Sequence, residues 1–78
     1  MNTALFRSHM AKHNDTQTSL AEAMGLVQSA VSQKVNGKVD FKQSEINFIR
    51  ARWGLSEKET VDIFFADEVS VQDTAKGA

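Results

Sequence analysis

The sequence predicts an all-α domain of five short helices. Apolar residues recur at the three- and four-residue spacings of helices through most of the first 65 residues. Glycines, asparagines and capping residues interrupt that spacing, and the chain has no proline. There are no internal repeats or low-complexity segments. A chain of 78 residues with 41% hydrophobic content is expected to form one small domain with a thin core.

The first two helices are expected at about residues 3–13 and 18–24. Thr3 can cap the first helix, whose apolar side is formed by three residues. These are Leu5, Phe6 and Met10. The polar segment 14–16 ends this helix and caps the next one. The second helix has a buried stripe formed by Leu20, Ala21 and Met24.

A tight turn and a third helix follow. Gly25 is placed to end the second helix in the left-handed conformation, which glycine adopts without a Cβ clash. Leu26 returns the chain to the core, and residues 28–35 form the third helix, which Asn36-Gly37 ends. Two helices joined by a turn of three or four residues, often with glycine, form a helix-turn-helix unit, whose second helix enters a DNA major groove.

The outward face of the third helix is polar. At about 100° per residue, four residues share an arc of about 140°, and Val31 and Val35 lie beside it and can pack inward. The four are Gln28, Ser29, Ser32 and Gln33. Glutamine suits adenine because its amide can bond N6 and N7 together, whereas serine can bond several bases. Each residue alone would suggest solvated surface, but the flanking glycine turn and Asn-Gly-Lys segment favour DNA recognition.

Residues 17–38 resemble the helix-turn-helix of phage repressor and Cro-like regulators. The resemblance rests on Gln17, Leu20-Ala21, Gly25, the Gln28-Ser29-x-Val31-Ser32 run and Asn36-Gly37-Lys38. It is specific over this segment and looser over residues 3–65. It implies a compact five-helix lambda-repressor-like DNA-binding domain that binds DNA as a dimer.

The same resemblance assigns roles to individual residues. Base contacts fall on Gln28, Ser29, Ser32 and Gln33. Phosphate contacts fall on Gln17, Asn36 and Lys38. One departure is Lys34, where many relatives carry a large apolar residue, and we expect Val35 to take over that role in the core.

A loop and two more helices complete the domain. Phe41 is expected to fill the core from the loop, and Gly54 ends a fourth helix over residues 43–53. The Ser56–Glu59 capping box begins a fifth helix, which runs to about Phe65. The residues expected to be buried are Leu20, Ala21, Met24, Val31, Ile46, Ile49 and Trp53.

Charge is distributed unevenly along the chain. The net charge is −1, but residues 1–54 carry seven basic and four acidic residues, whereas residues 55–78 carry two and six. Lys34, Lys38 and Lys42 cluster just after the polar face, where phosphate contacts are expected. The alternative is that these lysines form an ordinary solvated face, and this rival is strongest for Lys42.

Several function classes find no support in the sequence. The absence of cysteine excludes disulfides, cysteine–zinc sites and thiol nucleophiles. No apolar run is long enough to cross a membrane and the N-terminus lacks the pattern of a signal peptide, so a cytoplasmic protein is expected. His9 and His13 have a zinc-compatible spacing, but no third ligand follows, and two solvated histidines are expected. We expect no enzymatic activity, cofactor or metal.

The dimer interface is expected on the fifth helix and its exit. The residues assigned to it are Ile63, Phe64, Phe65 and Val69. Adjacent phenylalanines on a helix point about 100° apart, so one of them should cover a second surface. Val69 and Val71 alternate with a serine and could pair as a strand across the two-fold axis. The alternative is that both phenylalanines fill the core and the protein dimerises only on DNA.

Two function classes remain for this chain. The first is a dimeric, sequence-specific regulator of transcription that binds double-stranded operator DNA through residues 1–66. Residues 67–78 would form an acidic, flexible tail. The second is a protein-binding modulator or antirepressor of the same fold, which acts on another phage repressor. The low net charge and acidic tail keep this second class open.

Overall fold

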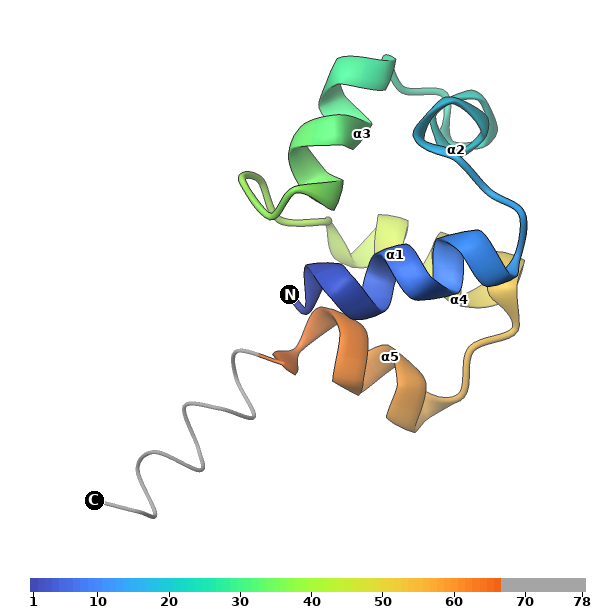
Figure 1. Cartoon of the computed structure of the whole chain (residues 1–78), viewed down its shortest axis with the longest axis vertical. Coiled ribbons are helices and arrows are strands. Elements are labelled where there is room, and N and C mark those ends of the chain that lie inside the picture. Colours follow the sequence, from blue (N-terminus) through green and yellow to red (C-terminus); the bar gives the residue numbers. More distant parts are fainter. Residues whose placement is uncertain (67–78) are drawn as a thin grey trace.

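The computed structural model describes residues 1–66, and within them it contains helices and no strand. The helices are α1 (Thr3–Lys12), α2 (Gln17–Met24), α3 (Gln28–Val35), α4 (Gln43–Trp53) and α5 (Glu57–Phe64). The prediction of an all-α domain with five short helices is therefore confirmed (Figure 1). The bounds of α3 and α4 agree with the predicted ranges, and the other helices differ from theirs by one residue at an end.

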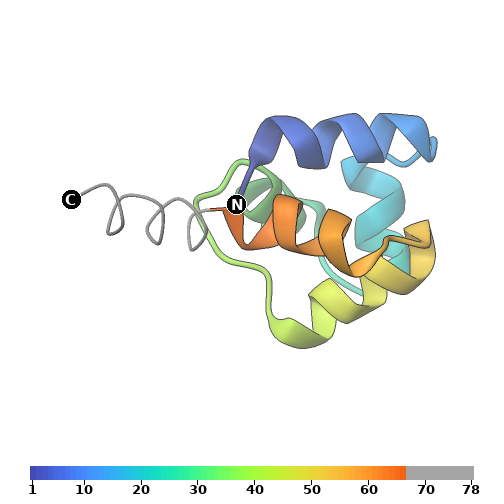
Figure 2. The same cartoon turned by 90° about the horizontal axis from the view of Figure 1, so that it is seen from below.

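The helices form three levels from one end of the molecule to the other. In Figure 1, α2 and α3 lie at the top, α1 and α4 lie in the middle, and α5 lies at the bottom. Figure 2 shows the same domain from below, with α1 and α4 on opposite sides of α5. The pair α2 and α3 consequently lies at the opposite end of the domain from α5.

An aromatic cluster fills the centre of this arrangement. Phe6 of α1 is fully buried, and its ring centroid lies 5.3 Å from that of Phe41, 5.2 Å from that of Trp53 and 5.9 Å from that of Phe64. Ring centroids at this separation are typical of favourable aromatic packing. Phe41 therefore fills the core from the loop before α4, as predicted.

Six of the seven residues that were expected to be buried are buried. They are Leu20, Ala21, Val31, Ile46, Ile49 and Trp53. Met24 is only partly buried, because it lies at the edge of the core near the end of α2. Leu55, which follows the left-handed Gly54, is a core residue that the sequence analysis did not include.

The helix caps agree with the sequence in two places and differ in one. Thr16 and Ser19 form a reciprocal capping box at α2, and Ser56 and Glu59 form one at α5. The cap of α1 is Asn2, because its Oδ1 accepts a 3.0 Å hydrogen bond from the Leu5 amide. The expectation that Thr3 caps this helix was wrong, since Thr3 is its first residue.

The predicted dimer surface is largely occupied by the fold itself. Ile63 is fully buried and Phe64 is 9% exposed, so neither side chain is available to a second subunit. Both side chains point inward, because α5 packs against α1 and covers one side of the core. Phe65 is half-buried and keeps some accessible surface. Val69 and Val71, and the predicted tail, lie outside the described residues.

Candidate nucleic-acid interface

The turn between α2 and α3 fixes the angle at which α3 leaves the domain. Gly25 has φ of 70°, a left-handed conformation that favours glycine, and its amide donates to carbonyls of the last turn of α2. The Leu26 amide then donates a 2.9 Å hydrogen bond to the Ala21 carbonyl. Leu26 packs against the core, so the connection of three residues is held at both ends.

One face of α3 is buried in the core and another face is exposed to solvent. Val31 and Val35 are fully buried, which confirms that Val35 belongs to the core. Gln28, Ser29 and Gln33 are exposed, and Ser32 is half-buried beside them. The structure therefore places all four predicted base-reading residues on the side of α3 that faces away from the core.

Lys34 does not fit the role of phosphate contact that was expected for it. Its side chain is buried, with Nζ 2.5 Å from Glu45 Oε1 on α4 and 5.8 Å from the centre of the Phe41 ring. The same carboxylate oxygen accepts a 2.8 Å hydrogen bond from the Lys42 amide. Lys34 is thus engaged in an ion pair inside the domain, and this ion pair links α3 to α4.

The pKa of Glu45 reflects this arrangement. Burial raises the pKa of its carboxyl group, but the hydrogen bonds from the Lys34 ammonium and the Lys42 amide outweigh that effect and lower it overall. The carboxyl group of Glu45 is therefore ionised at neutral pH. Two charged groups fixed at 2.5 Å hold the rotation of α3 about its axis relative to α4.

The remaining predicted phosphate contacts are placed around the two ends of the α2–α3 unit. Gln17 is half-buried at the first position of α2. Asn36 and Lys38 are exposed in the turn that follows α3, and Lys42 is exposed immediately before α4. Gly37 in that turn has φ of 78°, and a Cβ there would lie 3.3 Å from Thr3 Cγ2. The turn therefore packs closely against the start of α1.

Val27 is an exposed apolar residue at the start of α3 that the sequence analysis overlooked. It is the N-cap of the helix, it makes no side-chain capping bond, and it is 68% exposed. Polar residues are strongly preferred at N-caps. A valine at that position indicates from the sequence that no N-cap side chain accepts a hydrogen bond from the first backbone amides of α3.

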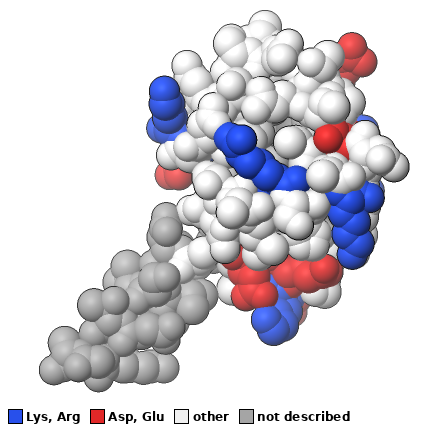
Figure 3. Space-filling model, in the orientation of Figure 1, with Lys and Arg blue, Asp and Glu red and all other residues white. Residues whose placement is uncertain are grey.

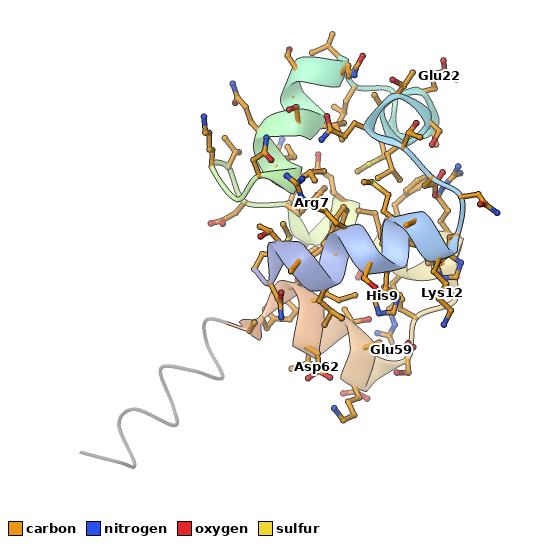
Figure 4. The ribbon with its side chains drawn as sticks, viewed as in Figure 1. Arg7, His9, Lys12, Glu22, Glu59 and Asp62 are labelled. Carbon is orange, nitrogen blue, oxygen red and sulfur yellow. The ribbon has the colours of Figure 1, made fainter. Side chains whose placement is uncertain are left out.

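A second overlooked residue is Arg7 of α1. Its Nη2 donates a hydrogen bond to Asn36 Oδ1, and Asn36 Nδ2 in turn donates to Ser32 Oγ over 3.4 Å. Figure 4 shows the labelled Arg7 side chain directed from α1 toward the end of α3. Because Ser32 Oγ accepts from Asn36, the hydroxyl proton of Ser32 is free to donate outward. No local signal links Arg7 to residues 29 positions later.

Acidic residues are concentrated away from this unit. No Asp or Glu occurs between Glu22 and Asp40, a stretch that includes all of α3. In Figure 3 acidic side chains gather at the bottom of the molecule, over α5. That helix carries Glu57, Glu59 and Asp62. Within residues 1–66, α3 therefore carries no acidic side chain of its own, whereas α5 carries three.

The two histidines are packed rather than freely solvated, which corrects the expectation from the sequence. Both are half-buried, and the rings of His9 and His13 lie 6.5 and 5.6 Å from Trp53 in nearly parallel planes. Stacking on the indole accounts for their four-residue spacing. No group of three or more potential metal-ligating side chains occurs among residues 1–66.

Comparison with known proteins places the chain in a family. Residues 6–68 match the family model described as "Protein of unknown function (DUF739)". The chain belongs to the DUF739 family. No curated protein and no solved structure matches it. The family match includes every residue of α2, α3 and α4 and the side chain of Arg7, so the candidate interface of this DUF739 protein lies wholly within the family region.

One more property of this DUF739 protein follows from its helices. Within the part of the chain that the structure describes, every helix is too short and too polar to cross a lipid bilayer.

Proposed function

We propose that this protein binds double-stranded DNA by inserting α3 into the major groove, and that it acts as a sequence-specific transcriptional regulator of the phage repressor and Cro-like type. The observation that carries the proposal is the division of α3. Its inward face is fully buried at Val31 and Val35, whereas its outward face is polar and uncharged. A helix with this division, held in a fixed rotation, is suited to reading base edges.

The outward face of α3 offers complementary kinds of base contact. Gln28 and Gln33 can bond the N6 and N7 atoms of adenine with one amide. Ser29 and Ser32 can bond several bases, and Ser32 has its hydroxyl proton free to donate. Val27 can contact the methyl group of thymine, because it is exposed next to Gln28. This set favours sites that contain A·T pairs.

The ends of the α2–α3 unit offer backbone contacts. Gln17 stands at the N-terminus of α2, and helix N-termini favour phosphate because their free N–H groups point outward. Asn36 and Lys38 follow α3, and Lys42 is a more distant addition. Contacts on both sides of a reading helix set its register on the duplex.

We further propose that two copies bind one operator. A single α3 offers few base contacts, and paired helices enter successive major grooves about 34 Å apart. Phe65 is the described residue of the expected interface that keeps accessible surface. Sedimentation of wild type and Phe65→Asp at high micromolar concentration tests this surface. A wild-type dimer that dissociates on substitution supports it, and a wild-type monomer excludes it for the free protein.

A titration by fluorescence anisotropy against a random 20-base-pair duplex tests the proposed function. With Lys38 and Lys42 on phosphates, raising salt from 50 to 200 mM should weaken binding about ten-fold for one bound copy and about a hundred-fold for two, because each lysine that neutralises a phosphate releases counterions. Absence of binding at low salt contradicts the proposal. Binding that is indifferent to salt also contradicts it, and would favour the alternative of a protein-binding modulator.

A further inference from the structure

We propose that Arg7 of α1 is a further contact to the DNA backbone, held in place by Asn36 against the C-terminal end of α3. The inference rests on the proposed DNA binding and assigns to it a residue outside the α2–α3 unit. It would extend the bound surface from two helices to three. Neither the motif spacing nor the charge pattern of the sequence singles out Arg7.

Arg7 has no acidic partner among residues 1–66. Its hydrogen bond goes to the neutral amide of Asn36, and no carboxylate of residues 1–66 forms an ion pair with it. Three other cations of the domain differ in this respect, since Lys34 is paired with Glu45, Arg52 with Asp15 and Lys58 with Asp62. Within residues 1–66 the positive charge of Arg7 is therefore uncompensated.

The guanidinium of Arg7 is held beside the C-terminal end of α3. Asn36 fixes one N–H group of the guanidinium, and the remaining donors of an arginine can grip two oxygens at once. Arg7 is exposed, and the turn that holds it also presents Lys38. Because Asn36 also donates to Ser32, the guanidinium is coupled to the polar face of α3. The two non-bridging oxygens of a DNA phosphate fit these donors.

Lys12, at the other end of α1, provides a matched comparison with Arg7. Lys12 is exposed on the same helix, and Figure 4 shows it at the end remote from α3. Lys12 and Arg7 carry the same charge and belong to one rigid element. If DNA contacts only the end of α1 near α3, loss of the Arg7 charge should weaken binding and loss of the Lys12 charge should not. If DNA merely attracts positive charge, the two losses should have equal effects.

The test uses the full chain and the variants Arg7→Ala, Arg7→Lys and Lys12→Ala. Each is titrated with the same duplex from 50 to 300 mM salt. We expect Arg7→Ala to reduce the log–log salt slope by about 1 and to weaken binding about five- to ten-fold at 100 mM salt. We expect Arg7→Lys to restore most of the slope and part of the affinity, because lysine keeps the charge but lacks the fork. Lys12→Ala should leave the slope unchanged.

The outcomes separate this inference from the proposed function. If the wild type binds with a salt-dependent affinity but Arg7→Ala and Lys12→Ala behave alike, only the Arg7 contact is overturned. A lower melting temperature of Arg7→Ala with an unchanged salt slope would likewise overturn it, since it would assign a structural role. A wild type that does not bind duplex DNA overturns both proposals together.

Discussion

The indole Nε1 of Trp53 donates a 2.6 Å hydrogen bond to Oδ2 of Asp15, which lies 38 residues earlier in the chain. The same carboxylate accepts two 2.9 Å hydrogen bonds from the guanidinium of Arg52 and one of 2.7 Å from Ser19 Oγ. Asp15 is 8% exposed. This one carboxylate therefore links the connection between α1 and α2 to the last turn of α4.

The first prediction is that Asp15→Asn destabilises the domain. The amide cannot accept all four hydrogen bonds, and it leaves the buried Trp53 N–H and the Arg52 guanidinium poorly paired. We expect a loss of about 2–4 kcal/mol in the free energy of unfolding at pH 7, measured by urea denaturation. Glu22→Gln is the control, because Glu22 is exposed, and it should change stability by less than about 0.5 kcal/mol. Equal stability of the two variants would show that the Asp15 contacts contribute nothing.

The second prediction concerns acid. Hydrogen bonds from Arg52, together with those from Trp53 and Ser19, outweigh burial and hold the pKa of Asp15 well below its usual range. A depressed pKa stabilises the fold above the unfolded value of about 3.9, and that stabilisation is lost as pH falls toward the folded pKa. Wild-type stability should therefore fall steeply below about pH 4, and that of Asp15→Asn should fall less. Parallel profiles from pH 7 to pH 2 would exclude this role.

Local patterns made the helices predictable. The inward spacing of Ile46, Ile49 and Trp53, followed by Gly54, defines α4 without knowledge of the rest of the fold. The same reasoning placed the bounds of α3 and its polar face. The helix bounds and the polar face of α3 both depend on residues only a few positions apart. They can therefore be predicted from a single sequence.

Contacts between distant segments account for the errors. Asp15 belongs to the polar segment 14–16, which was expected only to end one helix and cap the next, because its partners Arg52 and Trp53 lie 37 and 38 positions away. Lys34 resembles a surface lysine in the sequence, because the sequence does not show that it pairs with Glu45 on α4. The burial of a charge depends on such partners, and residue spacing along the chain does not reveal them.

The third prediction addresses base reading. Gln33→Ala should cost about 1–3 kcal/mol on the preferred duplex and relax the preference at one base pair. The measurement is an anisotropy titration against the duplex selected from a random pool and against its scrambled version. Gln43→Ala is the matched control, because this exposed glutamine begins α4. Undiminished binding of Gln33→Ala to the selected duplex would remove Gln33 from the reading face.

The fourth prediction addresses the backbone contact after α3. Lys38→Ala should weaken binding to all sequences alike and lower the log–log salt slope by about 1. Lys58→Ala is the control, since Lys58 is paired with Asp62 on the acidic α5. A loss confined to the selected duplex, with the salt slope unchanged, would assign Lys38 to base reading instead.

The fifth prediction locates the DNA on the protein. Backbone amide resonances of the ¹⁵N-labelled protein are followed while unlabelled duplex DNA is added. We expect the largest shift changes at the start of α2, around Gln17, and over residues 27–38, with a smaller set around Arg7. Changes concentrated on α5, or the absence of changes at low salt, would contradict the proposal that α3 reads DNA.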